Sequence, residues 1–178
     1  MFGAPGGSVR AMAYVDLHWV PLGAGGPKIV RATGRVYRAL TGAAPYHSAL
    51  TAEVDGVPWT IEVAPSPDEN QASRGVVATG AVGARLAGRL RVFRYEVRCW
   101  RDGIIPDLDH AVARIRLTED PDTVRRVLEL VRSVPTPVWG LRWNSNSMVA
   151  WVLSHAGLAE GITPPPGGRA PGWDAGNY

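Results

Sequence analysis

Apolar and polar residues alternate in two stretches of the chain, which is the pattern of a strand with one buried face. In residues 11–20, three apolar side chains alternate with two polar ones. These five residues are Val15, Asp16, Leu17, His18 and Trp19. Residues 90–100 alternate in the same way. Both stretches are predicted to be strands, and we interpret Asp16 and His18 as the solvated side of the first.

A hairpin is predicted where two extended runs flank an Asp-Gly pair. Residues 47–54 and 57–64 are the two runs, and Asp55-Gly56 lies between them. Asp-Gly is typical of the two-residue turns whose twist matches that of paired strands. Pro58 indicates an edge or a bulge at that end of the second strand. Residues 65–75 are expected to be a polar loop.

Residues 28–40 follow a glycine-rich loop at 23–26 and contain many valine, isoleucine and arginine residues. β-Branched residues favour strands, and Gly34 interrupts the run. The stretch is therefore predicted to be two short strands joined by a turn.

Two helices are expected in the second half of the chain. Asp120 is a good N-cap and Pro121 suits the first helical position. Apolar residues then recur at intervals of three and four, which predicts an amphipathic helix over 121–133. A second apolar run that stops at Gly157 predicts a helix over 146–156.

These elements predict one α+β domain, an antiparallel sheet packed against a few helices, over residues 9–160. Residues 1–8 are small and are expected to form a flexible N-terminus. Residues 161–178 are rich in glycine and proline and are expected to form a tail, or an ordered lap over the surface pinned by Trp173.

The composition of the 178-residue chain limits its chemistry. The single cysteine, Cys99, excludes an intramolecular disulfide and any metal site built on two thiolates, and it is expected in the core. No apolar run is long enough to cross a membrane and no secretion signal opens the chain, so the cytoplasm is the expected location. No cofactor and no metal are expected, because the acidic and histidine residues at 107–110 lack a supporting ligand pattern.

Six arginines lie close together in the middle of the chain. They are Arg85, Arg89, Arg91, Arg94, Arg98 and Arg101. We interpret them as a solvated face, and the alternative is a surface for a nucleic acid or another polyanion. A net charge of only +3 does not favour a nucleic-acid partner. No feature of the sequence specifies an oligomeric state.

Three polar residues far apart in the sequence form the candidate site. In the predicted hairpin, His47 and Glu62 are diagonal neighbours on one sheet face. A carboxylate beside an imidazole fixes its tautomer and stabilises its charged form. Ser145 lies at the start of the last predicted helix, where N–H groups and the positive helix end would stabilise an oxyanion.

This order of residues resembles that of the circularly permuted papain-like hydrolases. The class includes the NlpC-type permuted peptidases, the lecithin retinol acyltransferase type and the PPPDE peptidases. Their motif is Asn-Cys-Asn or Asn-Cys-Ser followed by an apolar helix, and here Asn144 opens an Asn-Ser-Asn-Ser motif, with serine in place of cysteine. The resemblance covers about 43–64 and 143–157. The chain also resembles a group of uncharacterised actinobacterial proteins that share its His, Glu and Trp-Asn-Ser-Asn-Ser features.

The resemblance implies a permuted papain-like fold and a role for each candidate residue. His47 would be the base, Glu62 the residue that orients it, and Ser145 the nucleophile. The implied reaction is hydrolysis or transfer of an acyl group on an amide, ester or thioester, with a small molecule or a peptide as substrate.

Four residues around the motif are candidates for substrate binding. They are Trp143, Asn144, Asn146 and Trp151. Other interpretations stay open for each candidate. The tryptophans would also suit core packing, and Asn144 and Ser145 would also suit helix capping. His47 would also suit a structural hydrogen bond, and Glu62 would also suit a solvated sheet face. The alternative function is an inactive papain-like scaffold that serves as a ligand-binding or protein-interaction module.

Overall fold

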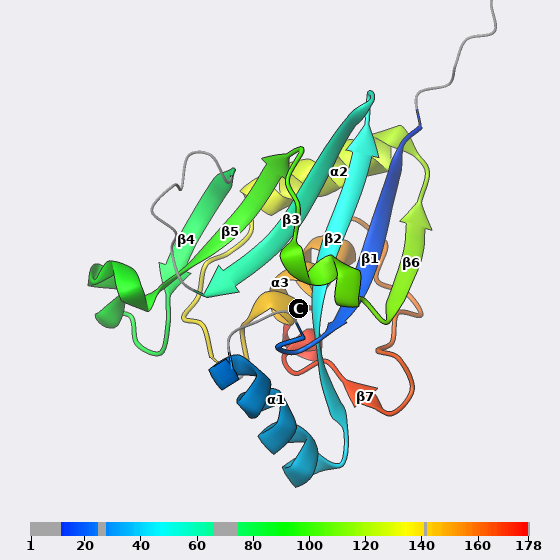
Figure 1. The fold of residues 1–178 in the computed structure, drawn as a ribbon. Helices are drawn as coiled ribbons and strands as arrows, with labels where there is room; N and C mark the ends of the chain where they lie inside the picture. Colours follow the sequence, from blue (N-terminus) through cyan, green and yellow to red (C-terminus); the bar gives the residue numbers. More distant parts are fainter. Residues whose placement is uncertain (1–11, 25–27, 66–74, 141, 178) are drawn as a thin grey trace, which may run out of the picture.

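The computed structural model describes residues 12–24, 28–65, 75–140 and 142–177. The predicted antiparallel sheet with a few helices is confirmed, and the sheet order is β4-β5-β3-β2-β1-β6 (Figure 1). The strands are β1 (Tyr14–Pro21), β2 (Ala44–Val54), β3 (Val57–Pro65), β4 (Val76–Ala81), β5 (Arg94–Arg101), β6 (Ala113–Thr118) and β7 (Gly168–Arg169), the last of which pairs with β2 in parallel. The helices are α1 (Lys28–Thr41), α2 (Pro121–Arg132) and α3 (Ser145–His155). Short 3-10 helices are η2 (Ala87–Arg89), η3 (Arg91–Phe93), η4 (Pro106–His110) and η5 (Trp173–Gly176).

The predicted hairpin is confirmed as β2 and β3. Val54 pairs with Val57, and Asp55 and Gly56 both have positive φ angles, 56° and 73°. Two positive φ angles are the mark of the turn that an Asp-Gly pair favours. Pro58 is not at an edge, because β3 lies between β2 and β5. It is tolerated because the pairing with β5 starts only at the next residue.

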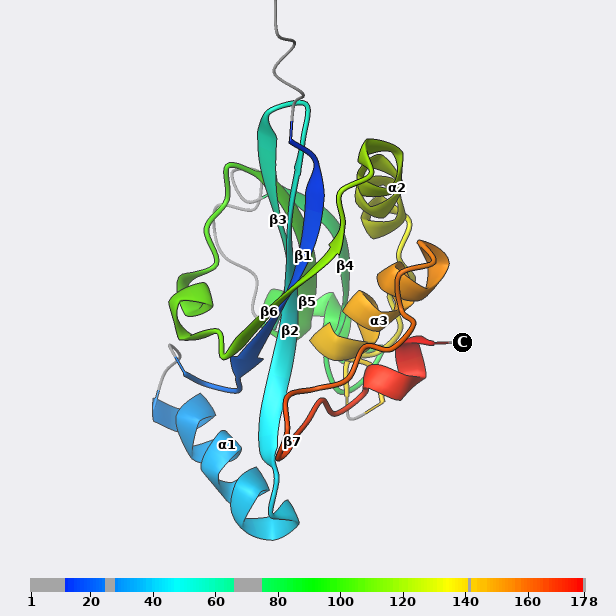
Figure 2. The same ribbon diagram turned by 90° about the vertical axis from the view of Figure 1, so that its right-hand side faces the viewer.

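One face of the sheet is apolar and is covered by α2 and α3 (Figure 2). Alternate residues of four strands face these helices and are buried: Val15, Leu17 and Trp19, then Leu50 and Ala52, Ile61 and Val63, and Tyr95, Val97 and Cys99. The helices contribute Val124, Val127, Leu128, Val131, Met148, Val149, Val152 and Leu153. Cys99 is therefore a core residue, as expected, and burial raises the pKa of its thiol.

The opposite face of the sheet is polar but also buried. Asp16 is fully buried and His18 is 8% exposed, so the interpretation of these two residues as solvated is wrong. The physical reason is the segment between β5 and β6, which crosses this face and includes η4 (Figures 1 and 2). Its carbonyl at Gly103 accepts a hydrogen bond from the Thr60 hydroxyl at 2.6 Å, and its Ile105 is 3% exposed.

The prediction of two short strands over 28–40 is wrong, because these residues form the helix α1. Gly34 does not interrupt the helix, but marks a close contact. A Cβ atom at this position would lie 2.7 Å from the carbonyl oxygen of Leu22. Glycine therefore lets the helix approach the end of β1. The exposed Val36 and Leu40 lie one turn apart, which is a helical spacing.

Both helices predicted in the second half are confirmed within one residue at each end. Asp120 caps α2, and its carboxylate accepts from the N–H of Thr123 at 2.8 Å. The helix α3 starts at Ser145 and is capped by Asn144. The strand predicted over 90–100 starts later, at Arg94, because η3 precedes it.

The strands β4 and β6 were not predicted. β6 does alternate, with Ala113, Ile115 and Leu117 on one side and the exposed Arg114 and Arg116 on the other, but it is only six residues long. The predicted flexible segment at 1–8 and most of the predicted loop at 65–75 lie outside the described residues. No helix in the described part of the chain is long and apolar enough to cross a membrane.

The glycine- and proline-rich C-terminal segment is packed onto α3. Trp173 is 7% exposed, and its ring centre lies 4.9 Å from that of Trp19 in β1. A Cβ atom at Gly172 would meet the side chains of Asn144 and Ser147, and one at Gly176 would meet the α3 backbone. The two glycines therefore permit the close contact between the C-terminal segment and α3. Trp173 anchors the segment, which agrees with the interpretation of an ordered lap over the surface.

Candidate functional site

A cavity of about 430 Å³ lies where the first turn of α3 meets the start of β2 and the C-terminal segment. Its apolar lining comes from Leu22, Pro45, Tyr46, Trp139 and Pro171. Its polar lining comes from His47, Asn144, Ser145 and Asn146. A largely apolar cavity with a few converging polar groups is the usual form of a small-molecule site.

Ser145 and His47 are 98 residues apart in the sequence and line the same cavity. Ser145 is the first residue of α3, and His47 lies near the start of β2, opposite Val20 of β1. Ser145 is 7% exposed, and its hydroxyl forms no hydrogen bond with any residue that the structure describes. The structure therefore brings together two of the three predicted catalytic residues.

Asn144 and Ser147, rather than Ser145, perform the capping of α3. The Asn144 side chain accepts from the N–H of Asn146 at 2.9 Å, and Ser147 Oγ accepts from the N–H of Asn144 at 3.2 Å. The Ser147 hydroxyl also lies 2.6 Å from the carbonyl oxygen of Gly172. This reciprocal arrangement is a capping box. The capping interpretation therefore applies to Asn144, and leaves the Ser145 side chain available to the cavity.

The Asn146 amide connects α3, β2 and the C-terminal segment. Its oxygen accepts from both the N–H and the hydroxyl of Ser48, at 2.8 and 2.9 Å. Its nitrogen donates to the carbonyl oxygens of Tyr46 and Pro171, at 2.9 and 3.0 Å. Two acceptor and two donor bonds use the whole capacity of an amide side chain. Asn146 thus builds the cavity wall, and its predicted contact with substrate stays a prediction.

Glu62 lies in a buried ion-pair cluster on the polar face of the sheet. Its carboxylate accepts from Arg98 at 2.8 Å, and Arg98 also binds Glu96 at 2.9 Å. All three side chains are at most 11% exposed. Burial lowers the pKa of Arg98, but the hydrogen bonds that it donates to Glu62 and Glu96 outweigh this effect, so the net shift of the pKa is upward. The predicted role of Glu62 in orienting His47 stays a prediction.

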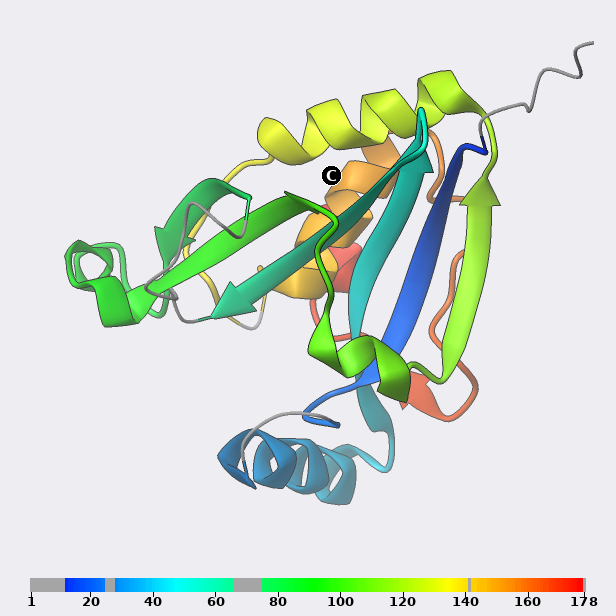
Figure 3. The same ribbon diagram turned by 45° about the horizontal axis from the view of Figure 1, so that its top comes forward.

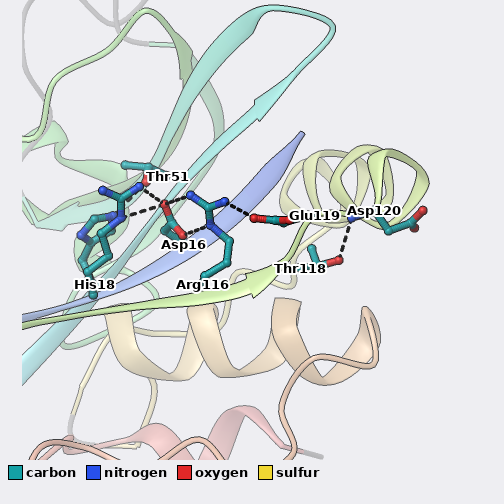
Figure 4. A network of polar contacts seen from close by, with 8 residues as sticks. Asp16, His18, Thr51, Arg116, Thr118, Glu119 and Asp120 are labelled. Carbon is teal, nitrogen blue, oxygen red and sulfur yellow. Dashed lines mark hydrogen bonds and ion pairs between the residues drawn. The ribbon is translucent and has the colours of Figure 1, made fainter. Parts of the chain in front are cut away.

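A second polar network lies on the same face at the other side of the sheet (Figure 4). Asp16 receives hydrogen bonds from Arg114 at 2.8 Å and from Arg116 at 2.5 Å. His18 Nε2 lies 2.8 Å from the hydroxyl of Thr51. Burial lowers the pKa of His18, although the nearby Asp16 opposes that shift. These contacts satisfy buried polar groups and lie away from the cavity.

Trp143 and Trp151 are not part of the lining of this cavity, and their predicted contact with substrate stays a prediction. Trp143 packs at the edge of the core and hydrogen-bonds the hydroxyl of Tyr95, whose pKa burial raises to about 12. Trp151 stacks on His155 with ring centres 4.0 Å apart. The tryptophan in the cavity wall is Trp139, which pairs with Val82 in an isolated bridge. Sequence reasoning missed it because residues 133–143 carry no periodic pattern.

The arrangement suits nucleophilic chemistry better than metal chemistry. Among the described residues, no three His, Cys, Asp or Glu side chains are close enough to hold a metal ion. The cavity is instead lined by a serine at a helix N-terminus, a histidine and an apolar wall. Comparison with known protein families, with curated proteins and with solved structures finds no match to this chain.

Proposed function

We propose that this protein is a hydrolase or acyl transferase of permuted papain-like architecture that acts on an amide, ester or thioester. Ser145 is the nucleophile and His47 is the general base. The observation that carries the proposal is the Ser145 hydroxyl, which belongs to a residue that lines the same cavity as His47 and forms no hydrogen bond with the described residues.

Ser145 lines the cavity, and no residue that the structure describes engages its hydroxyl. The neighbouring Ser147 hydroxyl is instead used in hydrogen bonds with Asn144 and Gly172. A hydroxyl that the fold does not use, at a cavity that it shares with a histidine, is suited to a partner that arrives with the substrate.

The reaction divides into two steps. Ser145 Oγ attacks the acyl carbon while His47 removes its proton, and the leaving group takes that proton from His47 as the acyl–serine bond forms. Water or a second acceptor then attacks the acyl group, with His47 again as base, and Ser145 regains its proton. Glu62 would support the charged imidazole only if it can turn from Arg98.

The oxyanion that forms in each step needs a donor. Capping by Asn144 already uses the N–H of Asn146. The N–H of Ser145 itself therefore remains as the donor at the first turn of α3, where the helix dipole adds to its effect.

A fluorophosphonate probe tests the nucleophile directly. We expect wild type to be labelled, Ser145→Ala to be unlabelled, and His47→Gln to be labelled at least about a hundredfold more slowly, in line with the usual contribution of a general base. Ser154→Ala, on the same helix, is the matched control and should label like wild type. Equal labelling of Ser145→Ala and wild type would overturn the assignment, as would an unlabelled wild type.

The engagement of Glu62 by Arg98 favours a second candidate, a ligand-binding module on an inactive scaffold. In that case wild type is not labelled by the probe, but the cavity still admits small molecules. Ser145→Cys would then be alkylated by iodoacetamide at residue 145, whereas Cys99 is 4% exposed and serves as the internal unreactive reference.

A further inference from the structure

Residues 85–93 form a projection at the far end of β4 and β5, which we call the arginine knob. It contains η2 and η3 and extends beyond the sheet, away from α2 and α3 (Figures 1 and 3, green coils). Four of its side chains are apolar and exposed, namely Leu86, Leu90, Val92 and Phe93, with exposed fractions of 73, 61, 73 and 45%. Three of the arginines that we interpreted as a solvated face, Arg85, Arg89 and Arg91, are exposed between them.

The backbone of the knob is held in place even though its apolar side chains are exposed. Arg94 donates from Nε to the carbonyl oxygen of Gly88 at 2.6 Å. The N–H of Leu90 donates to Ala87 at 2.9 Å, and the N–H of Phe93 donates to Leu90 at 3.0 Å. Apolar groups displayed on an ordered projection mark an interaction surface.

The charges around the knob select the partner. Residues 75–95 contain four arginines, Arg94 among them, and no Asp or Glu. The segment therefore favours an anionic surface. Of the six-arginine group, Arg98 does not contribute, because it is buried between Glu62 and Glu96.

We propose that the arginine knob inserts into the surface of an anionic lipid bilayer. Exposed leucine and valine gain nothing from a nucleic-acid backbone, which binds arginine and stacks on aromatic rings. The headgroup region of a bilayer accepts both kinds of side chain, since the aliphatic groups enter the acyl boundary while arginines bind lipid phosphates.

The position of the knob would bring the cavity close to the membrane. Val82 lies three residues before Arg85 and bridges to Trp139, which lines the cavity. The N–H of Gly83 also donates to the carbonyl oxygen of Trp139 at 3.1 Å. Membrane binding is nevertheless independent of the proposed function, because no step of it needs Ser145 or His47.

Co-sedimentation with vesicles tests the proposal. The vesicles are phosphatidylcholine alone, or an equimolar mixture of phosphatidylcholine and phosphatidylglycerol. We expect the full chain to bind the mixed vesicles at low salt and not the neutral ones. Val92→Ser should weaken binding about tenfold, comparable to the burial of a valine side chain. Arg89→Gln should weaken it about fivefold, since each arginine near an anionic surface contributes about 1 kcal/mol.

Two matched controls lie outside the knob. Ile104→Ser removes an apolar side chain that is 77% exposed, and Arg101→Gln removes an exposed arginine. Both should bind like wild type. Ser145→Ala should also bind like wild type, which separates failure of this proposal from failure of the proposed function.

Insertion is measured with an environment-sensitive dye. Because the only natural cysteine is buried, Val92→Cys can be labelled at one site, and a blue shift is expected on mixed vesicles but not for Ile104→Cys. Absence of binding to mixed vesicles would overturn the proposal. Insertion would be overturned if Arg89→Gln weakened binding, Val92→Ser left it unchanged and the dye showed no blue shift. Retention on single-stranded RNA without vesicle binding would assign the knob to a nucleic acid instead.

Discussion

The two faces of the sheet are both buried, but by opposite means. The face under α2 and α3 is filled by aliphatic and aromatic side chains such as Leu17, Leu50 and Ile61. The other face carries Asp16, Glu62 and other charged groups, which are covered by the segment between β5 and β6. The first face is stabilised by removal of apolar surface from water. The second is tolerated only because each buried charge has a partner.

This difference shows what each face requires of its residues. An apolar face tolerates exchanges that keep volume and shape, because its interactions have no direction. A buried charged face depends on the pairing of particular atoms, and the loss of one partner leaves the other charge in a poor solvent. The two faces should therefore respond differently to single substitutions.

The largest effect is expected for Arg98→Met. It leaves Glu62 and Glu96 buried without a counter-charge, so we expect a loss of about 3–5 kcal/mol in the free energy of unfolding. Urea denaturation measures this loss. A loss below that of an ordinary core truncation would show that water reaches the cluster.

A truncation on the apolar face provides the direct comparison. Leu50→Ala removes a fully buried side chain at the centre of the core, and about 3 kcal/mol is expected from lost transfer energy and the cavity left behind. Leu50→Met keeps the volume and should cost less than about 1.5 kcal/mol. Equal losses in the free energy of unfolding for Leu50→Ala and Leu50→Met would contradict the expectation that side-chain volume determines stability at this position.

Asn146 is the polar exception on the helix side of the sheet. Asn146→Ala removes four hydrogen bonds and leaves the N–H of Ser48 and two carbonyl groups without their partners. A loss of about 3 kcal/mol in the free energy of unfolding is expected, since three polar groups lose their partners and each costs at least about 1 kcal/mol. The C-terminal segment should also become more sensitive to proteolysis, which limited trypsin digestion at Arg169 would report. Unchanged digestion would mean that Trp173 alone holds the segment.

A smaller effect is expected for Arg114→Gln. The Arg114 side chain is 57% exposed, and Asp16 keeps its bonds to Arg116. Solvent screening limits the contribution of such an ion pair to the free energy of unfolding to at most about 1 kcal/mol. The comparison with Arg98→Met, measured in the same urea series, separates the exposed end of the charged face from its buried centre. Equal losses would contradict the distinction.

The smallest effect concerns pH and His18. Burial lowers the pKa of His18 in the folded chain, so the unfolded chain takes up the proton first as the pH falls. Stability should therefore decrease as the pH drops below about 6.5, the usual value for an unfolded histidine, and level off below the folded pKa. In His18→Gln this part of the pH dependence should be missing. The urea denaturation midpoints of wild type and His18→Gln are compared at pH 8 and at pH 5. The other histidines are present in both proteins, so the change in the difference between the two midpoints reports His18 alone.

The local elements were the most predictable part of the fold. The Asp55-Gly56 turn and the Asp120 cap each depend on neighbouring residues, and both were confirmed. The helix α1 was missed because Gly34 looks like a break in the sequence, whereas its function is contact with Leu22, a residue on another element. The burial of Asp16 was missed for a similar reason, because the segment that covers it comes almost a hundred residues later.

The candidate site was predictable in part. The order of residues pointed to His47 and Ser145, and the structure places both at one cavity, while their catalytic roles stay predictions. Trp139 was not found, because a loop residue without periodicity gives no signal of where its side chain lies. The surface that we propose for membrane binding was also hidden, since the arginines of 85–101 look alike in sequence while Arg98 is buried and Arg89 is exposed.

The sequence alone therefore determined the turns, the helix caps, the hairpin register and the presence of a serine at a helix start, because these depend on residues within a few positions of one another. Only the tertiary structure decided which polar residues are buried, which serine is left unbonded and which apolar residues stay exposed. These properties depend on what another part of the chain places against each residue. Ser145 and Ser147 are two positions apart. The local capping box and the return of Gly172 to the helix both engage Ser147, whereas the tertiary structure leaves Ser145 at the cavity.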